Sequence, residues 1–292
     1  MNKLAKFLII SSTCLSTSSF AENALRYFGQ QENSYISSIA YGNNRQAGHY
    51  QNVGDTQIYY EIYGSGKPVV VLHGGLVGSI AEMGQFIDKL SPNYQVIAVS
   101  TRGHGKSGIG SLTPSYSQKA KDLNAVLGQV KEPVTLLGFS DGAYTAYQFA
   151  LDYPEKVSKI IAIGAGTWKK GFRHFGGSFT DFSKLDTNYW QQQQGIRPEP
   201  ARMNEWYQKN IMYFNQLEVS AESLSKITQP VLVLAGEKDQ NAPLDTIISA
   251  YKAIPNAQLA IIPNAPHPVF QVNFPAVWEN IEPFLKHDKY YR

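Results

Sequence analysis

The feature that most constrains the fold is a repeated alternation between short, unbroken apolar runs and segments with helical spacing. The apolar runs predict strands at residues 68–72, 95–100, 134–137, 157–164, 230–236 and 258–262. Helical spacing predicts helices at residues 80–90, 115–130, 143–151, 243–253 and 274–287. Strands that are apolar throughout are typical of a parallel sheet with helices on both faces. The sequence therefore predicts an α/β fold with a mostly parallel sheet, preceded by an alternating edge strand at residues 56–64.

Two segments depart from this alternation and set the expected domain boundaries. Residues 22–50 are polar without a sustained period, and they predict an N-terminal arm. Residues 167–228 are rich in Trp, Tyr and Phe and are too long for an ordinary connection, so they predict a small helical lid inserted after the strand at 157–164. The core domain is then expected at residues 51–166 and 229–292.

The first 21 residues resemble a secretory signal peptide. Lys3 and Lys6 precede a short apolar stretch, and small residues lead to an expected cleavage after Ala21. The apolar stretch is much shorter than the roughly 20 residues that a membrane span needs. Cys14 is the single cysteine and lies inside this segment, so the mature chain is expected to have no disulfide and no cysteine metal site. We expect an exported protein, in a bacterial periplasm or secreted.

The charge balance indicates a small-molecule partner. Without Lys3 and Lys6, the remaining 24 Lys and Arg exceed the 23 Asp and Glu by one. No run of like charges is present, which argues against nucleic acid and against stable membrane insertion after signal cleavage. The oligomeric state stays open.

A glycine-framed serine follows the predicted strand at 134–137. Gly138-Phe139-Ser140-Asp141-Gly142 matches the pattern of a nucleophile elbow, a tight turn from strand to helix. Glycines two positions either side leave room for such a turn, which raises the serine hydroxyl above the sheet. The helix that follows presents free backbone N–H groups to a developing anion.

A serine hydroxyl is a weak nucleophile, so it needs a base, and the base needs an orienting acid. Asp239 follows the strand at 230–236, and His267 follows the strand at 258–262. Glu237 and Asp245 are alternatives for the acid, because an acid at a strand end is often only a helix cap. The pattern predicts Ser140 as nucleophile, His267 as base and Asp239 as orienting acid.

With this order of Ser, Asp and His, the sequence resembles the α/β-hydrolase fold superfamily over residues 56–287. His73-Gly74-Gly75 is similar to the oxyanion loop of that superfamily, and the resemblance implies that the N–H groups of Gly75 and Asp141 form the oxyanion hole. The elbow is similar to the GWSDG of the biphenyl-hydrolase-like group, which includes valacyclovir hydrolase. Asn264-Ala265-Pro266 departs from the G-x-G that usually precedes the histidine, which leaves the shape of that loop open.

The resemblance implies a serine hydrolase that cleaves a carboxylic ester or a related small acyl compound through an acyl-enzyme, without metal or organic cofactor. Alternatives on the same triad are an enol-lactonase, a C–C bond hydrolase or an aminopeptidase-type hydrolase. The alternative of another class is a non-catalytic ligand-binding protein of the cell envelope.

Overall fold

The computed structural model describes residue 35 and residues 37–287 of the 292-residue chain, so the predicted signal peptide and Cys14 lie outside the described residues. Within the described part, one eight-stranded sheet has the strand order β1-β2-β4-β3-β5-β6-β7-β8. The strands are β1 (Gly48–Val53), β2 (Thr56–Tyr63), β3 (Pro68–Leu72), β4 (Gln95–Val99), β5 (Val134–Phe139), β6 (Val157–Ile163), β7 (Val231–Gly236) and β8 (Ala257–Ile262). From β4 through β8 every neighbouring pair is parallel, which confirms the predicted α/β fold class.

The prediction of an edge strand at residues 56–64 is wrong. β2 lies inside the sheet and pairs antiparallel with β4 on one side and with β1 on the other. β1 is the edge, and its start at Gly48 falls within the segment expected to be an arm. β1 was not predicted because, of its six residues GHYQNV, only Val53 is buried, so no apolar alternation marks the strand.

Helices cover both faces of the sheet, and the strands serve two separate apolar clusters. On β3, Val70 and Leu72 belong to one cluster, while Val69 and Val71 belong to the other. Because successive side chains point to opposite faces, a strand buried on both sides must be apolar at every position. One cluster contains side chains of α2 (Tyr116–Val126), α3 (Asp141–Asp152) and α8 (Leu244–Ala253), and the other those of α1 (Gly84–Leu90), α9 (Val269–Val272) and α10 (Phe274–Lys286).

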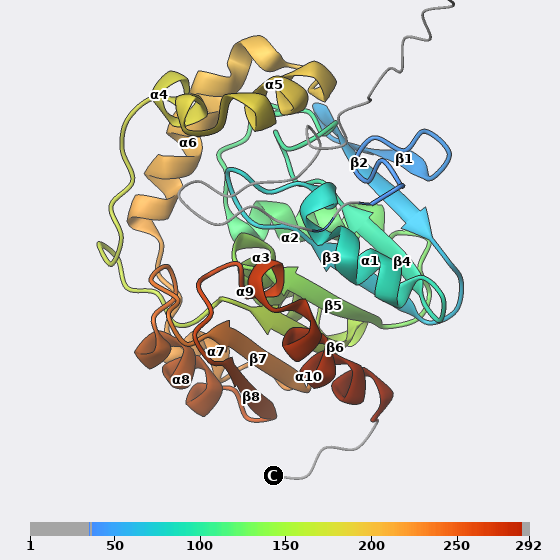
Figure 1. Cartoon of the computed structure of the whole chain (residues 1–292), viewed down its shortest axis with the longest axis vertical. Helices are drawn as coiled ribbons and strands as arrows, with labels where there is room; N and C mark the ends of the chain where they lie inside the picture. Colours follow the sequence, from blue (N-terminus) through green and yellow to red (C-terminus); the bar gives the residue numbers. More distant parts are fainter. Residues whose placement is uncertain (1–34, 36, 288–292) are drawn as a thin grey trace, which may run out of the picture.

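Residues 164–230, between β6 and β7, form a helical insertion. It contains α4 (Phe179–Ser183), α5 (Thr187–Ile196), α6 (Met203–Gln216) and α7 (Ala221–Leu224). Figure 1 shows α4, α5 and α6 together at the top of the molecule, apart from the helices that cover the sheet. A third apolar cluster joins Trp190 and Trp206 of the insertion to Leu76 and Ile109 of the core. The insertion thus packs on the loops that follow the strands.

Short 3-10 helices complete the described chain: η2 (Ile80–Met83), η3 (Pro154–Lys156), η4 (Lys184–Asp186) and η5 (Pro200–Arg202). η2 and α1 together span the predicted helix at 80–90. Among the helices of residues 35 and 37–287, none has the length and apolar character to cross a membrane.

Candidate active site

Ser140 lies at the junction of β5 and α3, in a backbone conformation that residues other than glycine rarely adopt. Its φ is 50° and its ψ is −113°, and its N–H donates to the carbonyl of Ile163 on the neighbouring strand. A Cβ at Gly138 would lie 2.4 Å from the carbonyl oxygen of Gly142, and a Cβ at Gly142 would lie 2.3 Å from that of Leu72. Both framing positions therefore require glycine, because a methyl group would overlap backbone atoms.

A continuous chain of hydrogen bonds links Ser140, His267 and Asp239. His267 Nε2 lies 2.9 Å from Ser140 Oγ, and its Nδ1 lies 2.7 Å from Asp239 Oδ2. A carboxylate only accepts, so Nδ1 carries the proton and Nε2 accepts from the serine hydroxyl. The other oxygen of Asp239 accepts from the N–H groups of Asn241 and Ala242, both at 2.8 Å. The aspartate is thereby fixed, and it holds the imidazole in the tautomer that a general base needs.

The two alternative acids have other positions. Glu237 accepts a hydrogen bond from the N–H of Asn264, at 2.7 Å, and so shapes the loop before His267. Asn264 has a φ of 56°, in the left-handed region that asparagine tolerates better than most side chains. This explains how Asn264-Ala265-Pro266 replaces a glycine-rich loop. Asp245 is exposed in the first turn of α8.

Gly75 and Asp141 lie side by side next to Ser140. A Cβ at Gly75 would lie 3.0 Å from Asp141 Cβ and 3.4 Å from Phe214 Cζ. Among the described residues, neither backbone N–H donates to another backbone carbonyl. Asp141 is the first residue of α3, where the N–H groups and the helix dipole favour an anion. The two N–H groups are thus available to an oxygen of a bound molecule.

Buried polar groups support the loop that carries Gly75. Glu82 Oε2 accepts from the N–H of Gly74 at 3.0 Å, and burial raises the pKa of the Glu82 carboxyl to about 8. His73 Nδ1 lies 2.7 Å from the Gly74 carbonyl, and Nε2 accepts from the N–H of Thr101 at 3.1 Å. Burial lowers the pKa of His73 to about 4, so the ring is neutral and holds both contacts without a charge.

A cavity of ≈ 330 Å³ opens above Ser140. Its floor comes from the loops after β3, β5 and β8 and includes Gly74, Gly75, Ser140, Asp141 and His267. Its roof comes from the insertion and consists of Trp168, Arg173, Phe175, Phe182, Tyr207 and Phe214. Ligand sites typically measure about 300–1,000 Å³, so this one fits a small molecule. The role of the insertion as a lid stays a prediction.

The comparisons with known proteins agree with this geometry. A model of the alpha/beta hydrolase fold family matches residues 67–182. The esterase EaEST of Exiguobacterium antarcticum superposes with a TM-score of 0.66 at 27% identity, over 82% of this chain and all of that chain. The chain is an α/β-hydrolase.

Named relatives place this α/β-hydrolase among enzymes of the hydrolase class. The 2-hydroxy-6-oxononadienedioate/2-hydroxy-6-oxononatrienedioate hydrolase of Paraburkholderia phymatum is 26% identical over 271 residues, covering 79% of this chain and 88% of that relative. The pimeloyl-(acyl-carrier protein) methyl ester esterase of Vibrio campbellii is 24% identical over 260 residues, covering 78% and 98%. Both relatives are consistent with a serine hydrolase. The resemblance to the biphenyl-hydrolase-like group stays a prediction.

Two site residues of the hydrolase were missed by sequence reasoning. Gly164, after β6, has a φ of 66°, and a Cβ there would lie 3.0 Å from His267 Cε1 and 3.4 Å from Asp239 Oδ2. Glu82 lies in the helix that the sequence predicts at residues 80–90. An acid in a first turn is common, so its sequence position gave no signal of the buried contact with Gly74.

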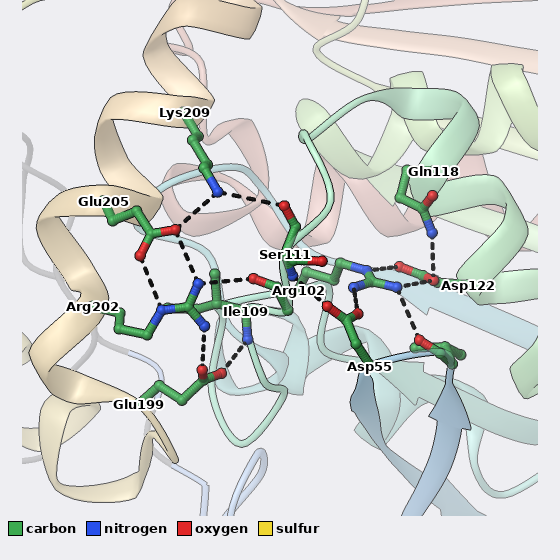
Figure 2. A network of polar contacts seen from close by, with 12 residues as sticks. Asp55, Arg102, Ile109, Ser111, Gln118, Asp122, Glu199, Arg202, Glu205 and Lys209 are labelled. Carbon is green, nitrogen blue, oxygen red and sulfur yellow. Dashed lines mark hydrogen bonds and ion pairs between the residues drawn. The ribbon is translucent and has the colours of Figure 1, made fainter.

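Arg102, in the loop after β4, joins that loop to α2 and to the end of β1 in the hydrolase core. Its guanidinium binds Asp122 of α2 at 2.6 Å and the carbonyl of Val53 at 3.2 Å, and it lies 3.4 Å from Asp55. Figure 2 shows this network beside a second one centred on Arg202 of the insertion. Within the described part of the hydrolase, no group of three His, Cys, Asp or Glu side chains is arranged to hold a metal.

Proposed function

We propose that this α/β-hydrolase cleaves a carboxylic ester, or a related small acyl compound, through an acyl-enzyme on Ser140. The observation that carries the proposal is the hydrogen-bonded chain from Asp239 through His267 to Ser140, at 2.7 and 2.9 Å, on the floor of a cavity. A serine so placed has both the base and the substrate space that nucleophilic catalysis requires.

In the proposed mechanism, His267 takes the proton of Ser140 as its oxygen attacks the carbonyl carbon. Asp239 stabilises the imidazolium that forms, and the N–H groups of Gly75 and Asp141 receive the oxyanion. Each such donor contributes about 3 kcal/mol in comparable sites. His267 then protonates the leaving group. In the second step His267 takes a proton from the water that attacks the acyl-enzyme, and it returns the proton to Ser140 as the acyl group leaves.

A second candidate is hydrolysis of a C–C bond by the same triad. It is favoured by the 26% identical relative, a 2-hydroxy-6-oxononadienedioate/2-hydroxy-6-oxononatrienedioate hydrolase. We place the ester first because the described site contains every group that ester hydrolysis needs, and because an esterase relative covers nearly as much of the chain. An enol-lactonase and an aminopeptidase-type hydrolase are further alternatives.

Labelling by a fluorophosphonate probe tests the proposed nucleophile. We expect the wild type to be labelled and Ser140→Ala not to be. Ser225→Ala, which removes an exposed serine, is the matched control and should label like the wild type. Equal labelling of wild type and Ser140→Ala, or none of either, contradicts the proposal and favours a ligand-binding role.

A substrate panel tests the reaction. It contains 4-nitrophenyl esters of increasing chain length, lactones, aminoacyl anilides and a 2-hydroxy-6-oxo-dienoate. Turnover of the esters supports the first candidate. Turnover of anilides alone, or of the dienoate alone, contradicts it.

We also propose that the chain is exported, on the basis of residues 1–21. The test is the N-terminal sequence of the protein recovered from the periplasm of an expressing bacterium. A mature chain that starts at Glu22 supports the proposal, and a full-length chain confined to the cytoplasm contradicts it.

A further inference from the structure

Arg173 places a positive charge in the roof of the cavity that holds Ser140. The side chain is partly buried and lines the same ≈ 330 Å³ space as Ser140 and His267. Its Cζ lies 4.6 Å from the ring centroid of Phe175 and 5.7 Å from that of Trp168. Both rings contact the guanidinium, but neither ring offers an oxygen that could accept a hydrogen bond from its five N–H donors.

The carboxylates in the cavity lining and next to it already have partners. The carboxylate of Asp141 is bound by Lys119 Nζ at 2.5 Å, with both side chains buried. Asp239 is enclosed by the hydrogen bonds from His267, Asn241 and Ala242. Among residues 35 and 37–287, by contrast, no acid forms an ion pair with Arg173.

A partly buried guanidinium without an acid is unusual, because leaving a charge unpaired away from water is costly. Burial lowers the pKa of Arg173, which reflects this cost. An anion that enters the cavity would accept hydrogen bonds from the Arg173 guanidinium, and these would replace the hydrogen bonds to water that burial removes. The roof is otherwise aromatic, so the remainder of such a molecule should be apolar.

We propose that the substrate carries a carboxylate that pairs with Arg173 while its scissile carbonyl lies at Ser140. This inference rests on the proposed function and names the substrate class: an acyl compound with a second, ionised carboxyl group. One guanidinium matches the single charge and the two oxygens of a carboxylate. A phosphate monoester carries close to two charges at neutral pH and would leave an excess in the cavity.

The competing explanation is that Arg173 only packs the insertion through its contacts with Phe175 and Trp168. Cation–π contacts of this kind contribute to stability without a ligand. The two explanations differ in one measurable property, since packing alone gives no preference between a charged and a neutral substrate.

The test compares two esters of nearly the same shape, mono-4-nitrophenyl adipate, which ends in a carboxylate, and methyl 4-nitrophenyl adipate, which does not. The quantity is the ratio of their kcat/KM values on one protein. We expect the wild type to favour the charged ester by about tenfold or more, as for hydrogen bonds between ionised groups. Arg173→Met should remove this preference, and Arg173→Lys, which keeps the charge, should retain part of it.

Lys170→Met is the matched control, because it removes an exposed positive charge from the same segment. It should keep the wild-type ratio. The same ratio in the wild type and in Arg173→Met overturns the proposal, and so does a loss of preference in Lys170→Met as large as that in Arg173→Met, which would indicate general electrostatics rather than a contact.

Binding separates this proposal from the proposed function. Calorimetry measures how tightly monomethyl adipate and dimethyl adipate bind to two proteins. One is Ser140→Ala, and the other carries Arg173→Met in addition to Ser140→Ala. Tighter binding of the charged ester, lost with Arg173→Met, supports the carboxylate site even if the wild type cleaves neither ester. Cleavage of both nitrophenyl esters without any charge preference overturns the carboxylate site and leaves the esterase proposal standing.

Discussion

The floor and the roof of the cavity are built on different physical principles. On the floor, directional hydrogen bonds fix each polar group: Asp239 accepts from His267 and from two backbone N–H groups, and Glu82 holds the N–H of Gly74. In the roof, aromatic rings supply most of the surface, and Arg173 is the cation among them. Hydrogen bonds specify positions closely, whereas apolar contacts tolerate changes of shape. The difference indicates that the floor sets the reaction and the roof sets the substrate.

The largest expected effect concerns the floor. Asp239→Asn keeps the shape of the side chain, but the amide no longer fixes the proton on His267 Nδ1. We expect kcat to fall by about 10,000-fold, the loss seen when a triad aspartate becomes asparagine. The measurement is steady-state hydrolysis of a 4-nitrophenyl ester. Asp245→Asn, on the exposed first turn of α8, is the control and should keep kcat within about twofold, as for a distant surface change. A similar kcat for both variants would refute the role of Asp239.

The second prediction tests whether the floor is as rigid as its hydrogen bonds suggest. Gly164→Ala places a methyl group 3.0 Å from His267 Cε1, so the imidazole must shift. The ring has to move by only a few tenths of an ångström, so we expect kcat to fall by less than the roughly 100-fold that a misplacement near 1 Å costs. Gly171→Ala in the insertion has a similar φ of 78° but meets nothing within 4 Å. It shares the backbone strain without the contact.

Thermal unfolding of these two variants measures the shared strain, which is about 1–2 kcal/mol for a side chain at positive φ. A kcat loss in Gly171→Ala equal to that in Gly164→Ala would mean that strain, not displacement of His267, lowers the activity. Activity would then be no more sensitive to a methyl group on the floor than to one in the insertion.

The third prediction concerns the buried acid under the floor. Burial raises the pKa of Glu82 from 4.5 to about 8 in the folded protein. Below pH 4.5 both the folded and unfolded states are protonated at this residue. Between pH 4.5 and about 8 only the unfolded state ionises, so this residue's contribution to stability is lost as pH rises. Glu82→Gln does not titrate, and its amide oxygen still accepts from Gly74.

We therefore expect the stability of Glu82→Gln relative to the wild type to increase from pH 5 to pH 8, by at most about 1.4 kcal/mol per pH unit. Chemical unfolding at pH 5, 6.5 and 8 measures the difference. A difference that is constant over this range would show that Glu82 is ionised in the folded state.

The comparison of floor and roof also explains how much could be predicted from sequence. The buried parallel strands were found because a strand such as Pro68–Leu72, covered on both faces, must be apolar throughout. Ser140, Asp239 and His267 were predicted because each follows a predicted strand, in an order that the α/β-hydrolase resemblance makes meaningful. The structure brings the three together as the prediction required.

The features that the sequence did not predict depend on contacts between residues far apart in the chain, which no local pattern indicates. Gly164 is required by the ring of His267, which lies about a hundred residues further along the chain. Arg173 follows Lys169 and Lys170 in the sequence, so it resembles part of a solvated basic segment. Its place in the cavity depends on how the insertion folds over the core. β1 buries too little to leave a pattern.

The smallest expected effect concerns the contact that joins the insertion to the core. Arg202 binds Glu199 at 2.5 Å, Glu205 at 3.0 Å and the carbonyl of Gly110 at 2.9 Å. Figure 2 shows Arg202 between Glu199 and Glu205. Its side chain is 35% exposed, so solvent screens these pairs. We expect Arg202→Gln to lower the free energy of unfolding by at most about 1 kcal/mol, and less at 1 M salt.

Arg102→Gln provides the contrast, because Arg102 and Asp122 are only 10% and 7% exposed. Removing one partner of a buried pair leaves the other charge uncompensated, so we expect a loss of about 3–5 kcal/mol that salt changes little. Chemical unfolding of both variants at low and high salt makes the measurement. If Arg202→Gln costs as much as Arg102→Gln in high salt, the polar contacts of Arg202, which include the carbonyl of Gly110, hold the roof over the floor. If its effect is small, the apolar cluster around Trp190 and Trp206 holds the two together, and the roof can change its lining residues without disturbing the triad below.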